Sequence, residues 1–135
     1  RRAIGAACST RCFAGAPGST TRGPEPGEFD AIVLVSPIWA FRLAGPMRSF
    51  VASRRDSLPR DVAMISAMGG AGAPNAVAEV TRLLGRPPLM HAAFTMKEVE
   101  DGTFTAPLEA FGQAVRQSQD RSDAARGPVT SPRAA

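Results

Sequence analysis

The residues best suited to bind a ligand lie in two short segments, each of which follows an apolar run. The first segment is Ser36-Pro37-Ile38-Trp39-Ala40, which contains the only tryptophan of the chain. An indole face beside a hydroxyl group and a small residue suits stacking on a flat heterocycle. The second segment is Met68-Gly69-Gly70, where the glycines would let backbone N–H groups reach a ligand. Together they predict a site for a planar ligand. The alternatives are that Trp39 packs into the core and that the glycines only form a turn.

Other residue types that often carry out chemistry are few and scattered. Cys8 and Cys12 stand in a C-x3-C spacing without a second cysteine pair, and His91 is the only histidine. A zinc site needs about four such ligands, so we predict no metal site and interpret the cysteines as free thiols rather than a disulfide. No Ser/His/Asp or Cys/His set is visible. We therefore predict no catalytic side chain and a structural role for His91.

The charge pattern argues against nucleic-acid binding, although the net charge is +4. Residues 30–115 carry equal numbers of basic and acidic side chains, so the excess lies in the flanking segments. No aromatic residues interleave with the flanking arginines to form a stacking surface for nucleic acid. The chain also has no apolar stretch of membrane-spanning length and no secretory signal at its start. We expect a cytoplasmic protein that binds neither nucleic acid nor membranes.

Apolar runs alternate with amphipathic segments along the chain. Residues 31–35 and 62–67 are predicted to be buried strands, and residues 89–96 are a weaker strand candidate. Helices are predicted over residues 46–58, with Pro46 in the first turn, and over residues 76–85, capped by Asn75 and ended by Gly85. A last helix is predicted over residues 106–117, and we expect Pro37 to end the first strand. This alternation predicts a parallel sheet with helices on both faces, and ligands bind such sheets beyond the carboxyl ends of the strands.

The length of 135 residues allows one domain. Residues 1–27 are predicted to be a partial helix, over residues 1–13, followed by a Gly/Pro-rich lead-in. Residues 28–117 form the predicted α/β domain, and residues 118–135 a disordered polar tail.

The segments FDAIVLVSPIWAFRLAGPMRSFV and VAMISAMGGAG resemble the flavodoxin-like family, including its NAD(P)H:quinone reductase branch. The resemblance covers about residues 28–116. It implies a three-layer α/β sandwich whose parallel sheet has the order 2-1-3-4-5, of which this chain would keep strands 3, 4 and 5. It also implies FMN binding, with Pro37, Ile38, Trp39 and Ala40 on one side of the flavin ring and Met68, Gly69 and Gly70 at its other edge.

The same resemblance implies a redox function, either electron transfer or NAD(P)H-dependent reduction of quinones or flavin. The partner would be a redox protein or a small quinone, and the flavin would do the redox chemistry.

The chain departs from this family at its start. The family binds the FMN phosphate in an S-x-T-G-x-T loop after its first strand, and residues 1–29 contain no such loop. Residues 15–21, GAPGSTT, have a suitable composition, but we predict no strand before them. We therefore expect weak FMN binding in a truncated family member. Without strands 1 and 2 the edge of residues 31–35 would be open, which would favour a homo-oligomer.

Two other functions remain open. The chain could have a flavodoxin-like fold without flavin and act as an interaction or regulatory module. It could also be another parallel α/β domain that binds a nucleotide or acts as a receiver, in which case substituting Trp39 would not affect ligand binding.

Overall fold

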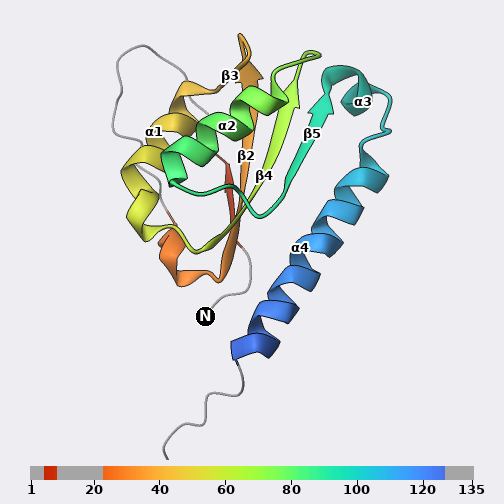
Figure 1. The fold of residues 1–135 in the computed structure, drawn as a ribbon. Coiled ribbons are helices and arrows are strands. Elements are labelled where there is room, and N and C mark those ends of the chain that lie inside the picture. The colour runs from red at the N-terminus through yellow and green to blue at the C-terminus, as the bar shows by residue number, and fades with distance from the viewer. Residues whose placement is uncertain (1–4, 9–22, 127–135) are drawn as a thin grey trace, which may run out of the picture.

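The computed structural model describes residues 5–8 and 23–126, which contain a parallel four-stranded sheet with one short antiparallel addition. The order is β1-β2-β4-β5, and β3 pairs with the end of β2 (Figure 1). The strands are β1 (Gly5–Cys8), β2 (Ala31–Trp39), β3 (Arg42–Leu43), β4 (Asp61–Met68) and β5 (His91–Thr95).

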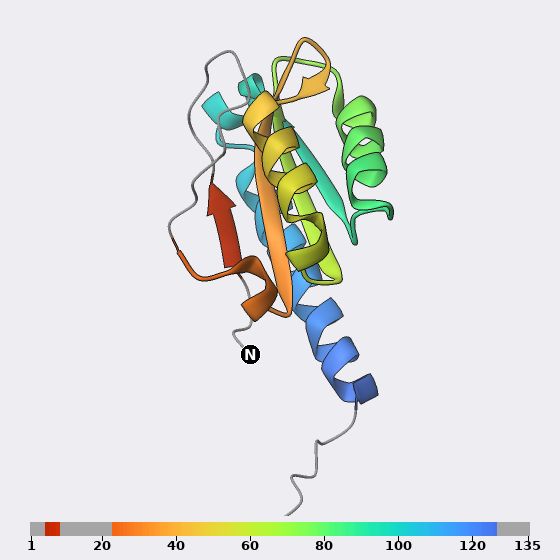
Figure 2. The same ribbon diagram turned by 90° about the vertical axis from the view of Figure 1, so that its left-hand side faces the viewer.

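Helices cover both faces of this sheet. The main helices are α1 (Gly45–Arg54), α2 (Ala73–Leu84) and α4 (Thr105–Arg126), and the short α3 (Met96–Glu100) follows β5. Two 3-10 turns, η1 (Pro26–Glu28) and η2 (Arg55–Ser57), precede β2 and β4. Figures 1 and 2 together place α1 and α2 on one face and α4 on the other. The protein is thus a three-layer α/β sandwich with a parallel sheet, as predicted.

The main core lies between the sheet and the α1/α2 layer. Side chains alternate along a strand, and Ile32, Leu34 and Ile38 of β2 enter this core while Val35 is 41% exposed. The helices contribute buried apolar side chains at helical spacing: Met47, Phe50 and Val51 from α1, and Ala76, Val80 and Leu84 from α2. Pro46 lies in the first turn of α1 and Gly85 ends α2 with a positive φ of 72°, both as predicted.

The strand order corresponds to strands 1, 3, 4 and 5 of the order 2-1-3-4-5, with no counterpart of strand 2 among the described residues. The three predicted strands are β2, β4 and β5, which confirms them as strands 3, 4 and 5 of an incomplete flavodoxin-like sheet.

The first strand corrects two predictions. A helix was predicted over residues 1–13, but Gly5–Cys8 form β1 and pair with β2 from Ile32 to Val35. Backbone hydrogen bonds to a neighbouring strand outweigh the weak strand propensity of Gly and Ala. The edge of residues 31–35 is therefore covered, and a strand does precede residues 15–21, which lie outside the described residues.

Pro37 does not end β2, which continues to Trp39. The carbonyl of Pro37 accepts a hydrogen bond from Ala44 N at 3.2 Å. The N–H and C=O of an extended residue point to the same side, so the N–H that proline lacks would also face Ala44. Pairing with β3 begins only at Ile38, so the proline breaks no strand pair on that side.

Two helix ends also differ from the predictions. Gly72, with a φ of 112°, precedes α2 in place of Asn75, which lies within the first turn. Helix α4 continues to Arg126, so residues 118–126 belong to a helix and not to a disordered tail. Gln, Arg and Ala in this stretch favour a helix even though it lacks an apolar face. Within the described segments, no helix has both the length and the apolar composition that a membrane span requires.

Candidate functional site

The two predicted segments lie at the same edge of the sheet. Strands β2 and β4 run parallel, and their last register pair is Pro37 with Ala67. Two residues later come Trp39, the last residue of β2, and Gly69, the first residue after β4. A Cβ on Gly72 would lie 2.8 Å from Ile38 Cγ2 and 3.0 Å from Phe41 Cα, so the chain just after the second segment packs against the end of the first. In Figure 1 this is the upper edge, where β2, β4 and β5 all end.

The eight predicted site residues divide into core and surface groups. Ser36 and Ile38 are 1% and 7% exposed, and their side chains belong to the core. The hydroxyl of Ser36 donates to the Pro37 carbonyl at 3.1 Å. Pro37 and Met68 are half-buried, whereas Trp39 is 50% exposed and Ala40, Gly69 and Gly70 lie at the surface. Surface groups of both predicted segments thus lie together, with Trp39 as the largest side chain among them.

Trp39 is the last residue of β2 and the first of a tight hairpin. It pairs with Arg42 of β3, and only Ala40 and Phe41 connect the two. Both connecting residues have positive φ angles, 48° and 63°. That is the backbone of a two-residue hairpin turn that normally uses Asn and Gly. The hairpin projects Trp39 and Phe41, which is 61% exposed, beyond the sheet.

The glycines of the second segment leave open space at the centre of the edge. A Cβ added to Gly69 or Gly70 would meet no atom within 4 Å. Strand β4 lies between β2 and β5 in the sheet, so this small-residue segment lies between the Trp39 hairpin and α3.

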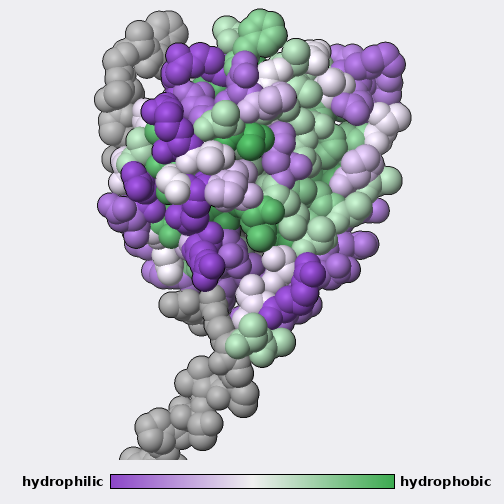
Figure 3. Space-filling model, in the orientation of Figure 1, coloured by the Kyte–Doolittle hydropathy of each residue, from purple (hydrophilic) through white to green (hydrophobic). Residues whose placement is uncertain are grey.

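Exposed apolar side chains flank the glycines on both sides. Trp39 and Phe41 come from the hairpin, and Met96 and Val99 come from α3, exposed by 53% and 42%. These are four of the six large apolar residues that are exposed among the described ones. Figure 3 shows apolar surface at the top centre of this edge and down the side between α2 and α4, whereas the corner at α3 is mainly hydrophilic. Large exposed apolar groups that gather at one edge indicate a binding surface.

Met96 and Val99 were not identified from the sequence, because Met96 belongs to the strand candidate 89–96 and Val99 stands in the mostly polar residues 97–103. One sequence signal could have identified them: Met96 and Val99 are three residues apart, the spacing that places two side chains on the same face of a helix. Thr95 and Glu98 form a capping box at the start of α3, and this start fixes the direction of the helix face that carries Met96 and Val99.

A buried carboxylate, also not identified from the sequence, holds the hairpin. Glu79 of α2 is 9% exposed and accepts a hydrogen bond from Leu43 N at 3.1 Å and one from Arg42 Nη2 at 2.9 Å. Arg48 Nη1 of α1 lies 3.5 Å from the same carboxylate. Burial acts to raise the pKa of Glu79, but these hydrogen bonds and arginine charges outweigh it and hold the pKa below its ordinary value. The sequence signal for this role was the position of Glu79, an acidic residue beside the apolar stripe of the helix predicted over residues 76–85.

His91 is the first residue of β5, at the amino end of the strand and away from the candidate site, and its side chain faces the core. Its Nε2 is 3.2 Å from the hydroxyl of Ser66, which is fully buried. Partial burial lowers the pKa of His91. The contact supports the predicted structural role. The prediction of free thiols at Cys8 and Cys12 stays open, because Cys12 lies outside the described residues.

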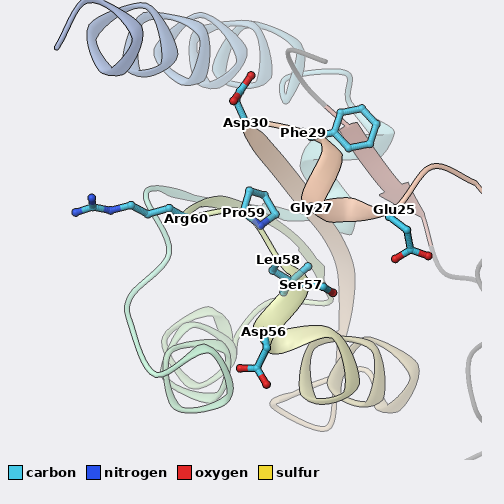
Figure 4. Close-up of a pocket in the computed structure, with 9 residues that line it drawn as sticks. All are labelled: Glu25, Gly27, Phe29, Asp30, Asp56, Ser57, Leu58, Pro59 and Arg60. Carbon is cyan, nitrogen blue, oxygen red and sulfur yellow. The ribbon is translucent and has the colours of Figure 1, made fainter. Parts of the chain in front are cut away.

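A cavity of about 540 Å³ lies at the opposite, amino edge of the sheet. It is bordered by η1, η2 and the starts of β2 and β4. Its carboxylates, from Glu25, Asp30 and Asp56, point in different directions in Figure 4 and do not converge on a common point. We therefore place the candidate site at the carboxyl edge.

Comparison with known proteins gives a limited result. No family model matches the chain, and the curated proteins contain no match. Among solved structures, a flavoprotein from Lactobacillus acidophilus in complex with FMN aligns at 19% identity with a TM-score of 0.47. The alignment covers 58% of this chain and 52% of the flavoprotein, so this chain spans about half of that protein's length.

Proposed function

We propose that this chain is a flavin-binding domain that holds the ring system of FMN at the carboxyl edge of its sheet. The observation that carries the proposal is the arrangement of the edge. Trp39 and Phe41 are exposed at the end of β2, Met96 and Val99 are exposed on α3 after β5, and the open positions Gly69 and Gly70 follow β4, which lies between β2 and β5. A flat, largely apolar ring suits such a surface.

The residues present fit the ring of FMN better than its phosphate. Trp39 offers a half-exposed indole for stacking, and the open positions at Gly69 and Gly70 allow a ligand to approach the backbone. The sequence contains no S-x-T-G-x-T loop. We therefore expect the ring to contribute most of the affinity and the phosphate little.

When bound, FMN supplies the redox chemistry by accepting and donating electrons. Trp39, Phe41, Met96 and Val99 would cover the ring and exclude water from it, and the backbone at Gly69 and Gly70 would orient its polar edge. We propose that the domain transfers electrons to a redox partner or takes part in NAD(P)H-dependent reduction of quinones.

The test uses the only tryptophan of the chain as a probe of the site. Titration of the full chain with FMN should quench Trp39 emission, because a stacked flavin accepts the excitation energy. Riboflavin should bind with similar affinity, because it has the same ring without the phosphate. A tenfold preference for FMN would correspond to about 1.4 kcal/mol of phosphate binding and would contradict the weak role assigned to the phosphate.

Two matched variants locate the binding site. Trp39→Ala should weaken flavin binding about tenfold, measured by flavin fluorescence, because stacking contributes about 0.5–1.5 kcal/mol beyond burial. Leu89→Ala removes a similarly exposed apolar side chain near the start of β5, at the opposite edge, and should leave binding unchanged. No quenching by either flavin would reject the proposal and favour an interaction module. Equal binding by Trp39→Ala and the unchanged chain would reject this site.

A further inference from the structure

The hairpin that carries Trp39 does not owe its position to its own turn. Ala40 and Phe41 both adopt the left-handed region, which residues other than glycine disfavour because their Cβ lies too close to the following carbonyl oxygen. Neither residue is the Asn or Gly that such turns normally contain. Contacts elsewhere must therefore keep the hairpin in place.

The carboxylate of Glu79 contacts both residues of β3. Its Oε2 accepts from the backbone N–H of Leu43, and its Oε1 accepts from the guanidinium of Arg42. Those two residues are the register partners of Ile38 and Trp39. The side chain of Glu79 therefore holds β3, the strand that pairs with Trp39 at the candidate site.

Two further contacts converge on the same point. Arg48 of α1 lies 3.5 Å from Oε1, so the carboxylate links both helices of that layer to β3. Gly72, at the start of α2, lies directly against Ile38 and Phe41, where a Cβ would collide. The helix that supplies Glu79 also provides the surface on which the hairpin rests.

We infer that Glu79 is a positioning residue, which fixes the Trp39 hairpin and thereby the ring-binding side of the site. The consequence for ligand binding rests on the proposed function, whereas the effect on the hairpin does not. Glu79 itself touches no ligand in this scheme, because it is buried beneath β3.

Arginines of two other elements contact the carboxylate of Glu79, and one more arginine lies near it on α2. Arg42 comes from β3 and Arg48 from α1, and Arg82 of α2 borders the same shallow surface beside the hairpin. Loss of the carboxylate charge would leave these cations without their counter-ion and would weaken the hydrogen bond to Leu43. The hairpin should then move more freely while the sheet remains intact.

The experiment compares Glu79→Gln with Glu109→Gln, which makes the same chemical change at an exposed position of α4. Amide exchange at Leu43 should accelerate about tenfold or more in Glu79→Gln, because hydrogen bonds to charged groups contribute more than neutral ones. Acrylamide quenching of Trp39 should increase in Glu79→Gln. Both quantities should stay unchanged in Glu109→Gln.

A pH titration gives a second measurement on the unchanged chain. Protonation of Glu79 should raise acrylamide quenching of Trp39 as the pH falls below the ordinary glutamate range, and Glu79→Gln should lack this transition. If Leu43 exchange and Trp39 quenching match the unchanged chain in Glu79→Gln, the inference is wrong, whatever flavin does.

Flavin binding is then measured separately. If the hairpin loosens in Glu79→Gln and flavin binding weakens with it, both the inference and the proposed function are supported. If the hairpin loosens but the unchanged chain binds no flavin, the positioning role stands and the proposed function fails.

Discussion

At the scale of single residues, the protein concentrates its unusual backbone geometry at one turn. Ala40 and Phe41 hold positive φ angles beside the half-exposed Trp39. Non-glycine residues in this region are typical of sites where the surrounding structure imposes a conformation for function. The turn thus trades stability for the placement of two aromatic rings.

Replacement of the first turn residue should recover part of that stability. Ala40→Gly removes a left-handed penalty of about 1–2 kcal/mol, and the added chain entropy of glycine offsets about 0.5–1 kcal/mol of it. We expect a net gain in the free energy of unfolding, measured with urea.

Ala52→Gly is the matched control, because Ala52 is exposed and lies in α1 with no positive φ. It should destabilise the protein by about 0.5–1 kcal/mol. Loss of stability in Ala40→Gly would contradict the strain assigned to the turn.

The only histidine predicts how stability depends on pH. Burial lowers the pKa of His91 below its ordinary value, so the unfolded chain binds the proton first as the pH falls. The contribution of His91 to stability should be complete above the ordinary histidine pKa and should decline as the pH falls from there to the lower folded pKa.

Urea unfolding at pH 8 and pH 5.5 measures this effect, and His91→Gln isolates it from the carboxylates. The variant should lose less stability between the two pH values than the unchanged chain. An equal loss in both would show that the titration of His91 does not affect folding.

Several site residues could not be predicted from the sequence because their role depends on neighbours far along the chain. The sequence shows Glu79 as one polar position in an amphipathic helix, and its partners come from β3 and α1, which are distant in the sequence. Trp39 was predicted to follow a strand that Pro37 ends, whereas it is the last residue of β2, and its hairpin was not predicted. Ala40-Phe41 lacks the turn residues by which such hairpins are recognised.

At the scale of elements, periodicity predicted those strands and helices that bury apolar side chains. Strands β2 and β4 are mostly apolar runs, of which β2 is rich in β-branched residues, and α1 and α2 bury apolar residues at helical spacing. β1 was missed because Gly5–Cys8 are small residues whose strand conformation comes from pairing with β2. The end of α4 was missed because its last turns have no apolar face to recognise.

Helix α4 depends on few buried contacts. Val115 is its only fully buried residue, at 1% exposure, and Gln119 Nε2 donates to Asp61 Oδ2 at 2.9 Å. Val115→Ala should lower the free energy of unfolding by about 2 kcal/mol, because two buried carbons are lost and a cavity remains. Amide exchange along α4 should show whether the helix loosens first.

Gln113→Ala, an exposed change in the same helix, should alter stability by less than about 0.5 kcal/mol. If the two variants have equal effects, α4 does not rely on Val115 to hold it against the sheet.

At the scale of the whole molecule, the sheet is more complete than the sequence indicated. The order β1-β2-β4-β5 places a strand beside β2, so the edge of residues 31–35 that was predicted to be open is paired. β1 and β5 occupy the ends of this order. The topology also brings three successive strand ends to one edge, which is why residues from three separate segments can line a single site.

The strained hairpin also affects the order in which the chain folds. A short hairpin is usually among the fastest structures to form. Here the turn residues favour another conformation, and the Leu43–Glu79 contact closes a loop of 36 residues. The hairpin should therefore close only after α2 has docked, so Ala40→Gly should slow unfolding and leave the folding rate unchanged in stopped-flow measurements. The hairpin residues of the candidate site would then be the last part of the chain to reach their native positions.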